Sequence, residues 1–227
     1  MNLSLATGAQ WDWAFAWEIL PQLLSAMRVT VTATLLGMSL AVFGGLLLVM
    51  MRRSHIKTLS RSGYWTIEFI RGTPLLIQLY FFYYVLPEYG LQQSAMVTGV
   101  LALGLHYSSY MAEVYRAGID AVPKGQWEAA TALNFPPKRT FFTLILPQAI
   151  PPIVPASGNY LVAMFKDSVL LSTITVTEVL YTARDDIGSD RFRYLEPLTL
   201  VGVLFLIVSL ISVAGIRRLE RHLEKKR

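Results

Sequence analysis

The sequence lacks cysteine and is poor in charge. Because none of its 227 residues is cysteine, disulfide bonds, cysteine-ligated zinc and thiol catalysis are all excluded. Charged residues make up only 15% of the chain, against about 25% in ordinary soluble domains. Hydrophobic residues, in contrast, make up 54%. This composition indicates an integral membrane protein that contacts lipid rather than a soluble domain.

Several short motifs of enzymes are also missing. The sequence has no G-x-x-x-x-G-K-[ST] phosphate loop, so we do not expect the chain to bind ATP itself. It has no His-Glu-x-x-His and no Gly-x-Ser-x-Gly pattern, which counts against a membrane-embedded enzyme. The formal net charge of +5 is concentrated between apolar segments, which favours a membrane surface over nucleic acid. We therefore predict a protein that is not an enzyme and has no cofactor and no metal site.

Five stretches approach the length of about 20 apolar residues that a membrane-spanning helix needs. We place these spans at about 22–51, 64–87, 94–115, 140–165 and 197–217. The fourth span contains four prolines, which predict a broken or delayed helix start. The stretch 169–183 is too short and too polar to cross, and we expect it to be re-entrant or interfacial. The fold class is therefore an all-α integral membrane protein that forms one domain over residues 1–227.

Basic residues alternate between the connections, except in the mixed fourth one, where acidic residues offset Arg184, Arg191 and Arg193. The connections after the first and third spans, and the segment after the fifth, are rich in Lys and Arg, whereas 87–93 has neither. Because connections rich in Lys and Arg stay in the cytoplasm, this alternation places the N-terminus outside and the C-terminus in the cytoplasm. The polar segment between the third and fourth spans is then cytoplasmic.

That polar segment, 124–147, has the pattern of a helix-turn-helix. Lys124 to Leu133 consists mainly of good helix formers and follows Pro123, a residue suited to a helix start. Asn134 tolerates the left-handed conformation that ends many helices. Lys138 to Leu146 can then form a second short helix.

The segment resembles the coupling motif of permeases of binding-protein-dependent ABC importers. The matching residues are Gly125, Glu128-Ala129-Ala130, Asn134 and Leu146-Pro147. The chain departs from the family at Asn134, where glycine is usual, although asparagine is well suited to the left-handed region. Four further segments are similar to the polar amino acid transport subfamily (histidine, glutamate and glutamine type, with ectoine permeases included), namely Phe69–Leu76, Ala112–Ile119, Val122–Gln126 and Lys166–Ser172.

The resemblance implies the type I permease fold of ABC importers, in the inner membrane. It implies import of a polar amino acid or of an amino-acid-like zwitterion such as ectoine. The implied partners are two ATPase subunits, an external solute-binding protein, and a homologous permease or a second copy of the chain. Glu128 would face a basic group of the ATPase. The alternative is a secondary transporter of small polar solutes driven by an ion gradient, but such folds commonly carry internal repeats, and none is visible here.

Ionisable and polar residues within spans are candidates for the translocation path or a gate, because burying them in a membrane is costly. Glu68 and Arg71 are three residues apart, as are Glu113 and Arg116, so each pair can form an ion pair that serves structure alone. His106 is interpreted more readily as a packed histidine than as a solute contact. The candidates for the path or gate are Glu68, Arg71, Gln78, Tyr83, Tyr107, Glu113, Lys166, Asp167 and Ser168.

Overall fold

The computed structural model describes residues 10–224, so the ends of the predicted domain, 1–9 and 225–227, lie outside the described residues. Helices account for nearly all of the described chain, and no strand occurs in it. The long helices are α1 (Trp13–Arg52), α4 (Ala95–Asp120), α7 (Leu146–Asp167) and α10 (Leu195–Glu224). The shorter α-helices are α2 (Lys57–Gly72), α3 (Leu75–Tyr80), α5 (Lys124–Ala132), α6 (Pro137–Arg139), α8 (Val179–Tyr181) and α9 (Ser189–Arg191).

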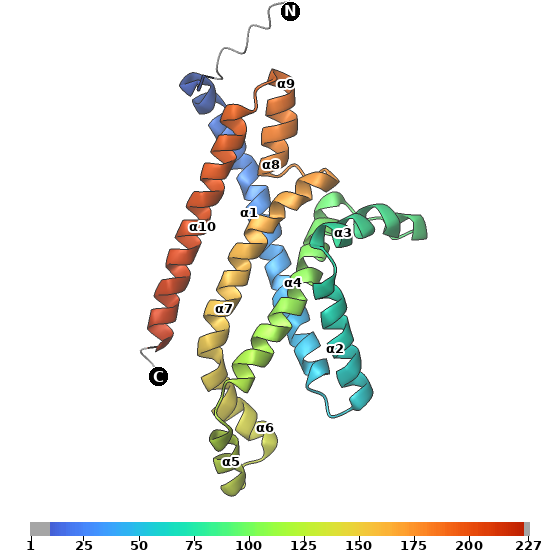
Figure 1. The fold of residues 1–227 in the computed structure, drawn as a ribbon, viewed down its shortest axis with the longest axis vertical. Coiled ribbons are helices and arrows are strands. Elements are labelled where there is room, and N and C mark those ends of the chain that lie inside the picture. Colours follow the sequence, from blue (N-terminus) through green and yellow to red (C-terminus); the bar gives the residue numbers. More distant parts are fainter. Residues whose placement is uncertain (1–9, 225–227) are drawn as a thin grey trace, which may run out of the picture.

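Five segments of π or 3₁₀ geometry complete the order: η1 (Phe81–Val85), η2 (Leu86–Tyr89), η3 (Thr140–Ile145), η4 (Ser168–Ile174) and η5 (Thr182–Gly188). The long helices run side by side along the long axis of the molecule (Figure 1). The helices α5 and α6 protrude at one end, and α8 and α9 lie at the opposite end. The two ends therefore differ in structure, as the asymmetric charges of the sequence suggest.

Three of the described helical runs are long and apolar enough to cross a membrane: Trp13–Arg52, Pro137–Ile174 and Leu195–Leu223. A fourth crossing is counted if Lys57–Gly72 and Leu75–Tyr89, which are bent by 99°, form one span. The remaining predicted span, 94–115, corresponds to α4, which has 26 residues. At 1.5 Å per residue α4 is about 39 Å long, which exceeds a hydrocarbon core of about 30 Å, but α4 is not among the described helices that are both long and apolar enough to cross, so the five spans stay a prediction.

The bend between α2 and α3 interrupts the predicted second span, 64–87, which we expected to be one helix. Thr73 has extended backbone angles (φ −106°, ψ 135°), and Pro74 follows it as the N-cap of α3. Proline disfavours the α conformation in the residue before it, so the helix ends at Gly72 and restarts in a new direction. The bend places Gln78 beside the end of α2, where its side-chain nitrogen donates to the carbonyl oxygen of Ile70 at 2.7 Å.

The fourth predicted span contains its prolines inside a helix. The helical run begins with α6 at Pro137 and continues through the π-helical segment η3 into α7, where Pro147 lies in the first turn. Pro151, Pro152 and Pro155 lie within α7 without ending it. The prolines therefore neither break nor delay this helix, because the run Pro137–Ile174 is helical without interruption, and the predicted broken or delayed start is wrong. The predicted non-spanning stretch 169–183 contains only the short helices η4 and α8 and part of η5.

The core forms where α1 and α4 cross. These helices approach so closely that glycines occupy the contact: a Cβ added to Gly45 would lie 2.5 Å from Cβ of Met111, and one added to Gly44 would lie 2.8 Å from Cβ of Ser108. Met111 and Ala112 are almost completely buried there. Small residues permit such approach in membranes, where dispersion contacts and hydrogen bonds hold helices together.

Candidate functional site

The exposed helix α5 ends in a complete Schellman motif. The N–H of Phe135 donates to the carbonyl oxygen of Ala130, and the N–H of Asn134 donates to that of Thr131, both at 3.0 Å. Asn134 has φ of 55°, so it adopts the left-handed conformation that the sequence predicts for it. The motif fixes the direction in which the chain leaves α5 without any glycine at the turn.

One face of α5 is packed and the other is open. Ala130 is 1% exposed, and Trp127 packs against a small cluster at the end of α4 and the start of α7 that comprises Ile119, Val122, Phe141, Ile145 and Ala149. Glu128 and Ala129 are exposed, as is Leu133, at 71%. Within the described residues Glu128 forms no ion pair, and its carboxylate is free to meet another chain.

Gly125, at the start of α5, is exposed, and a Cβ added there would meet no atom within 4 Å. Nothing within the described chain therefore requires a glycine at this position. Glycine inside a helix costs roughly 0.5–1 kcal/mol relative to alanine. Leu146 and Pro147, which complete the predicted motif, form the first turn of α7.

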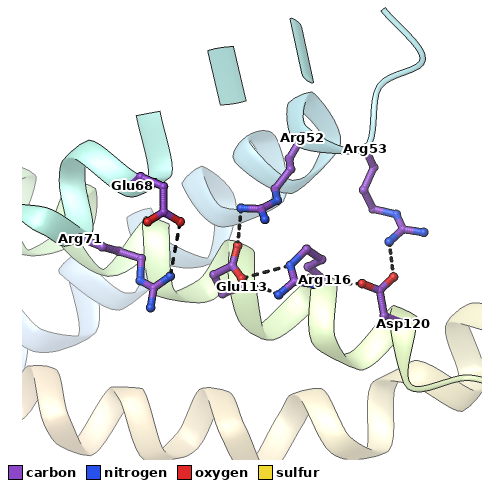
Figure 2. Close-up of polar contacts among 7 residues, drawn as sticks. All are labelled: Arg52, Arg53, Glu68, Arg71, Glu113, Arg116 and Asp120. Carbon is purple, nitrogen blue, oxygen red and sulfur yellow. Dashed lines mark hydrogen bonds and ion pairs between the residues drawn. The ribbon is translucent and has the colours of Figure 1, made fainter. Parts of the chain in front are cut away.

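A cluster of five charged side chains joins α1 to α4 at the end of the molecule that carries α5. The charge cluster consists of Arg52, Arg53, Glu113, Arg116 and Asp120 (Figure 2). Glu113 accepts hydrogen bonds from Arg52 at 2.8 Å and from Arg116 at 2.8 and 3.0 Å. Asp120 accepts from Arg53 at 2.6 Å and from Arg116 at 3.1 Å. Arg116 therefore bridges both carboxylates, and the cluster is one connected network.

Glu68 and Arg71 are drawn beside this network in Figure 2 but are only loosely paired. Their closest charged atoms are 3.9 Å apart, and both side chains are about 40% exposed. The guanidinium of Arg71 instead lies 5.4 Å from the ring centre of Tyr110. Arg71 therefore points toward the aromatic side chains of α4.

Those aromatic side chains belong to a polar–aromatic cluster that comprises Gln78, His106, Tyr107, Tyr110, Tyr160 and Asp167. The Tyr107 hydroxyl donates to the Asp167 carboxylate at 2.7 Å. His106 Nδ1 lies 3.3 Å from the side-chain oxygen of Gln78. The rings of Tyr110 and Tyr160 are 5.2 Å apart. Residues from α3, α4 and α7 thus meet in one polar region between the long helices.

Three other predicted residues lie outside this cluster. Lys166 is exposed. The hydroxyl of Ser168 donates to the carbonyl oxygen of Phe165 at 2.6 Å, so it is used within the helix end. The Tyr83 hydroxyl lies 3.2 Å from that of Thr175.

Comparison with known proteins decides the family. The family model of the binding-protein-dependent transport system inner membrane component matches residues 33–225. The chain belongs to this family. It is 46% identical over 224 residues to the probable amino-acid ABC transporter permease protein y4tG of Sinorhizobium fredii, covering 96% of both chains. It is 33% identical to the arginine transport system permease protein ArtQ of Bacillus subtilis, covering 90% of this chain and 94% of the relative.

A solved structure agrees with these relatives. A chain of the structure described as an amino acid ABC transporter with histidines superposes with a TM-score of 0.90 at 34% identity, covering 94% of this permease and all of that chain. The type I permease fold expected from the sequence is therefore confirmed. Membership of a binding-protein-dependent family also disfavours the alternative of a secondary transporter.

Sequence reasoning missed part of the polar–aromatic cluster of this permease. Tyr160 was not a candidate, because a single tyrosine in a proline-rich span carries no local signal. His106 was interpreted as a packed residue, and its burial is consistent with that, but it also contacts Gln78. Glu113 was a path candidate, whereas its carboxylate is occupied by two arginines of the charge cluster.

Proposed function

We propose that this permease carries a polar amino acid, or an amino-acid-like zwitterion such as ectoine, into the cytoplasm. It works with a second permease or a second copy of itself, with two ATPase subunits, and with an external solute-binding protein. The N-terminus lies outside and the C-terminus lies in the cytoplasm, so α5 faces the ATPase. The amino-acid substrate is supported by the names of the relatives and by the solved transporter of 34% identity.

The observation that carries the proposal is the open face of α5. A helix that Trp127 fixes to the end of α4 and to the start of α7, but that leaves Glu128 and Leu133 uncovered, has the form of a docking surface. The apolar side chain of Leu133 suits a pocket of the ATPase, and the carboxylate of Glu128 suits a basic side chain there. Rotation of two ATPase subunits about the interface would move α5, and the packed helices would follow as a rigid body.

The polar–aromatic cluster suits a zwitterion. The rings of Tyr110 and Tyr160 and the carboxylate of Asp167 offer partners for an ammonium group. The guanidinium of Arg71, which lies beside Tyr110, suits a carboxylate. We propose that Arg71, Gln78, Tyr107 and Asp167 line the translocation path.

The experiment that tests the proposal replaces Glu128 with lysine in the complete complex, reconstituted into proteoliposomes with its ATPase and binding protein. Glu128→Lys should abolish solute uptake, because it brings a second positive charge to the basic site of the ATPase. Glu220→Lys is the matched control, since Glu220 is an exposed acid near the end of α10, a helix that does not pack against α5 in the described residues. Undiminished uptake by Glu128→Lys, or equal loss in both variants, would count against docking through α5.

A further inference from the structure

The charge cluster lies at the end of α4 that leads into α5. Only three residues separate the end of α4 at Asp120 from the start of α5 at Lys124. Trp127 packs against Ile119 and Val122, so α5 and the last turn of α4 share one small apolar cluster. A movement of α5 therefore reaches the end of α4, which carries Glu113, Arg116 and Asp120, and it also reaches η3 and the start of α7.

The charge cluster also holds α1 and α2, through Arg52. The guanidinium of Arg52 donates to Glu113 and lies 5.0 Å from the ring centre of Tyr64 in α2. The carbonyl oxygen of Arg52 accepts a hydrogen bond from the Ser60 hydroxyl at 2.7 Å. A Cβ added to Gly63 would lie 2.9 Å from the backbone nitrogen of Arg52. Arg52 is thus the point at which α1, α2 and α4 meet.

The ion pairs of the charge cluster are partly buried and connected, so they can hold α4 against α1. Glu113 and Arg52 are about one-fifth exposed, at 19% and 21% of their side chains, so water screens their ion pair only in part. Arg116 shares its donors between Glu113 and Asp120, which makes the five residues a network rather than isolated surface pairs. Directional contacts of this kind add to the close packing of α1 against α4 at this end of the two helices.

We propose that Glu113 is a positioning residue that transmits the movement of α5 to α1 and α2. It does so by holding the end of α4 against Arg52, so that the three helices and α5 move as one body. The proposal rests on the proposed function for its consequence in transport, but not for the rigidity that it asserts. Glu113 needs no contact with solute or with the ATPase in this role.

The absence of cysteine from the sequence makes a direct test of rigidity simple. One cysteine replaces Lys57 and a second replaces Lys124, and each carries one spin label. Both positions are exposed, and they are the first residues of α2 and α5. In the otherwise unaltered complex the distance distribution between the labels should stay narrow, with and without ATP. Glu113→Gln removes the charge at nearly constant shape, and it should broaden the distribution. A distribution as narrow as that of the parent would overturn the proposal.

The second measurement is the amount of solute imported per ATP hydrolysed by the complete complex. Glu113→Gln should lower this ratio by about fivefold or more, while ATP hydrolysis continues. A factor of about five is the lower end of what ordinary coupling free energies between two sites produce. Glu220→Gln is the matched control and should leave the ratio within about twofold of the parent. An unchanged ratio in Glu113→Gln would contradict the role in transmission.

A second variant and the label distances keep the proposal testable if Glu113→Gln does not assemble or if no solute is imported. If Glu113→Gln does not assemble, Arg52→Lys replaces it, because lysine keeps the charge but loses the forked donor and the stacking on Tyr64. Arg52→Lys should then broaden the label distances and lower the ratio, and parental behaviour in both would overturn the proposal. If the parent complex imports none of the tested solutes, the proposed substrate fails, whereas the label distances still decide the rigidity.

Discussion

Replacing Gly45 with alanine tests the packing of α1 against α4, on which the whole arrangement depends. The added Cβ would lie 2.5 Å from Cβ of Met111 and 3.0 Å from the backbone nitrogen of Ala112. Neither atom is the mobile end of a side chain, so the two helices must separate. Overpacking of this kind costs about 1–3 kcal/mol. The better helix propensity of alanine offsets roughly 0.5–1 kcal/mol of this cost, which leaves a net loss of up to about 2.5 kcal/mol.

The assay is the apparent melting temperature of the purified permease complex in detergent, together with its yield from the membrane. Gly45→Ala should lower the melting temperature. Gly202→Ala is the control, because Gly202 also lies inside a long helix, α10, but a Cβ there would meet no atom within 4 Å. The control should match the parent or melt slightly higher. Equal melting temperatures for Gly45→Ala and the parent would refute the close contact.

Three further predictions concern single side chains. Asn134→Gly should keep uptake, whereas Asn134→Val should lower it, because φ of 55° is strained for a β-branched residue. Asp12 accepts a hydrogen bond from the backbone N–H of Phe15 and pairs with Arg193, and these contacts lower its pKa. Its stabilisation is present above the unfolded pKa of about 3.9 and is lost as pH falls through the lower folded value. The melting-temperature gap between the parent and Asp12→Asn, which keeps a capping side chain, should therefore close as pH falls below about 4. Asp167→Asn should raise the half-saturating solute concentration about tenfold or more, and an unchanged value would remove Asp167 from the path.

Local features of the fold were predictable because their causes are local. The left-handed turn at Asn134 follows from the residue itself, and the helix before it follows from good helix formers after Pro123. In each case the backbone preference of one or two residues decides the structure.

The 99° bend at Pro74 shows where this reasoning fails. A proline predicts that a helix ends, but not whether the chain continues straight or turns, because packing of the next segment decides the direction. Pro151, Pro152 and Pro155 show the opposite error, since surrounding helices allow α7 to continue through them. The sequence therefore does not show which proline ends or bends a helix and which one the helix tolerates.

The candidate site was predictable only in part, because its contacts join distant positions. The Glu113–Arg116 pair is local in sequence, so spacing alone suggests it. The bonds from Arg52 to Glu113 and from Tyr107 to Asp167 join residues that are 61 and 60 positions apart. No periodicity within one helix reveals which residues of another helix it will face. The exposed face of α5, in contrast, was suggested by the motif around Glu128.

ATP-driven uptake by the reconstituted complex tests the central claim most directly. Proteoliposomes would contain this permease, its ATPase subunits and any second permease, with the solute-binding protein outside and ATP inside. Labelled amino acids and ectoine would be offered one at a time. The predicted result is accumulation of at least one of them that requires ATP, the ATPase and the binding protein together. Accumulation by the permease alone, driven by a proton or sodium gradient and unaffected by ATP, would contradict the claim.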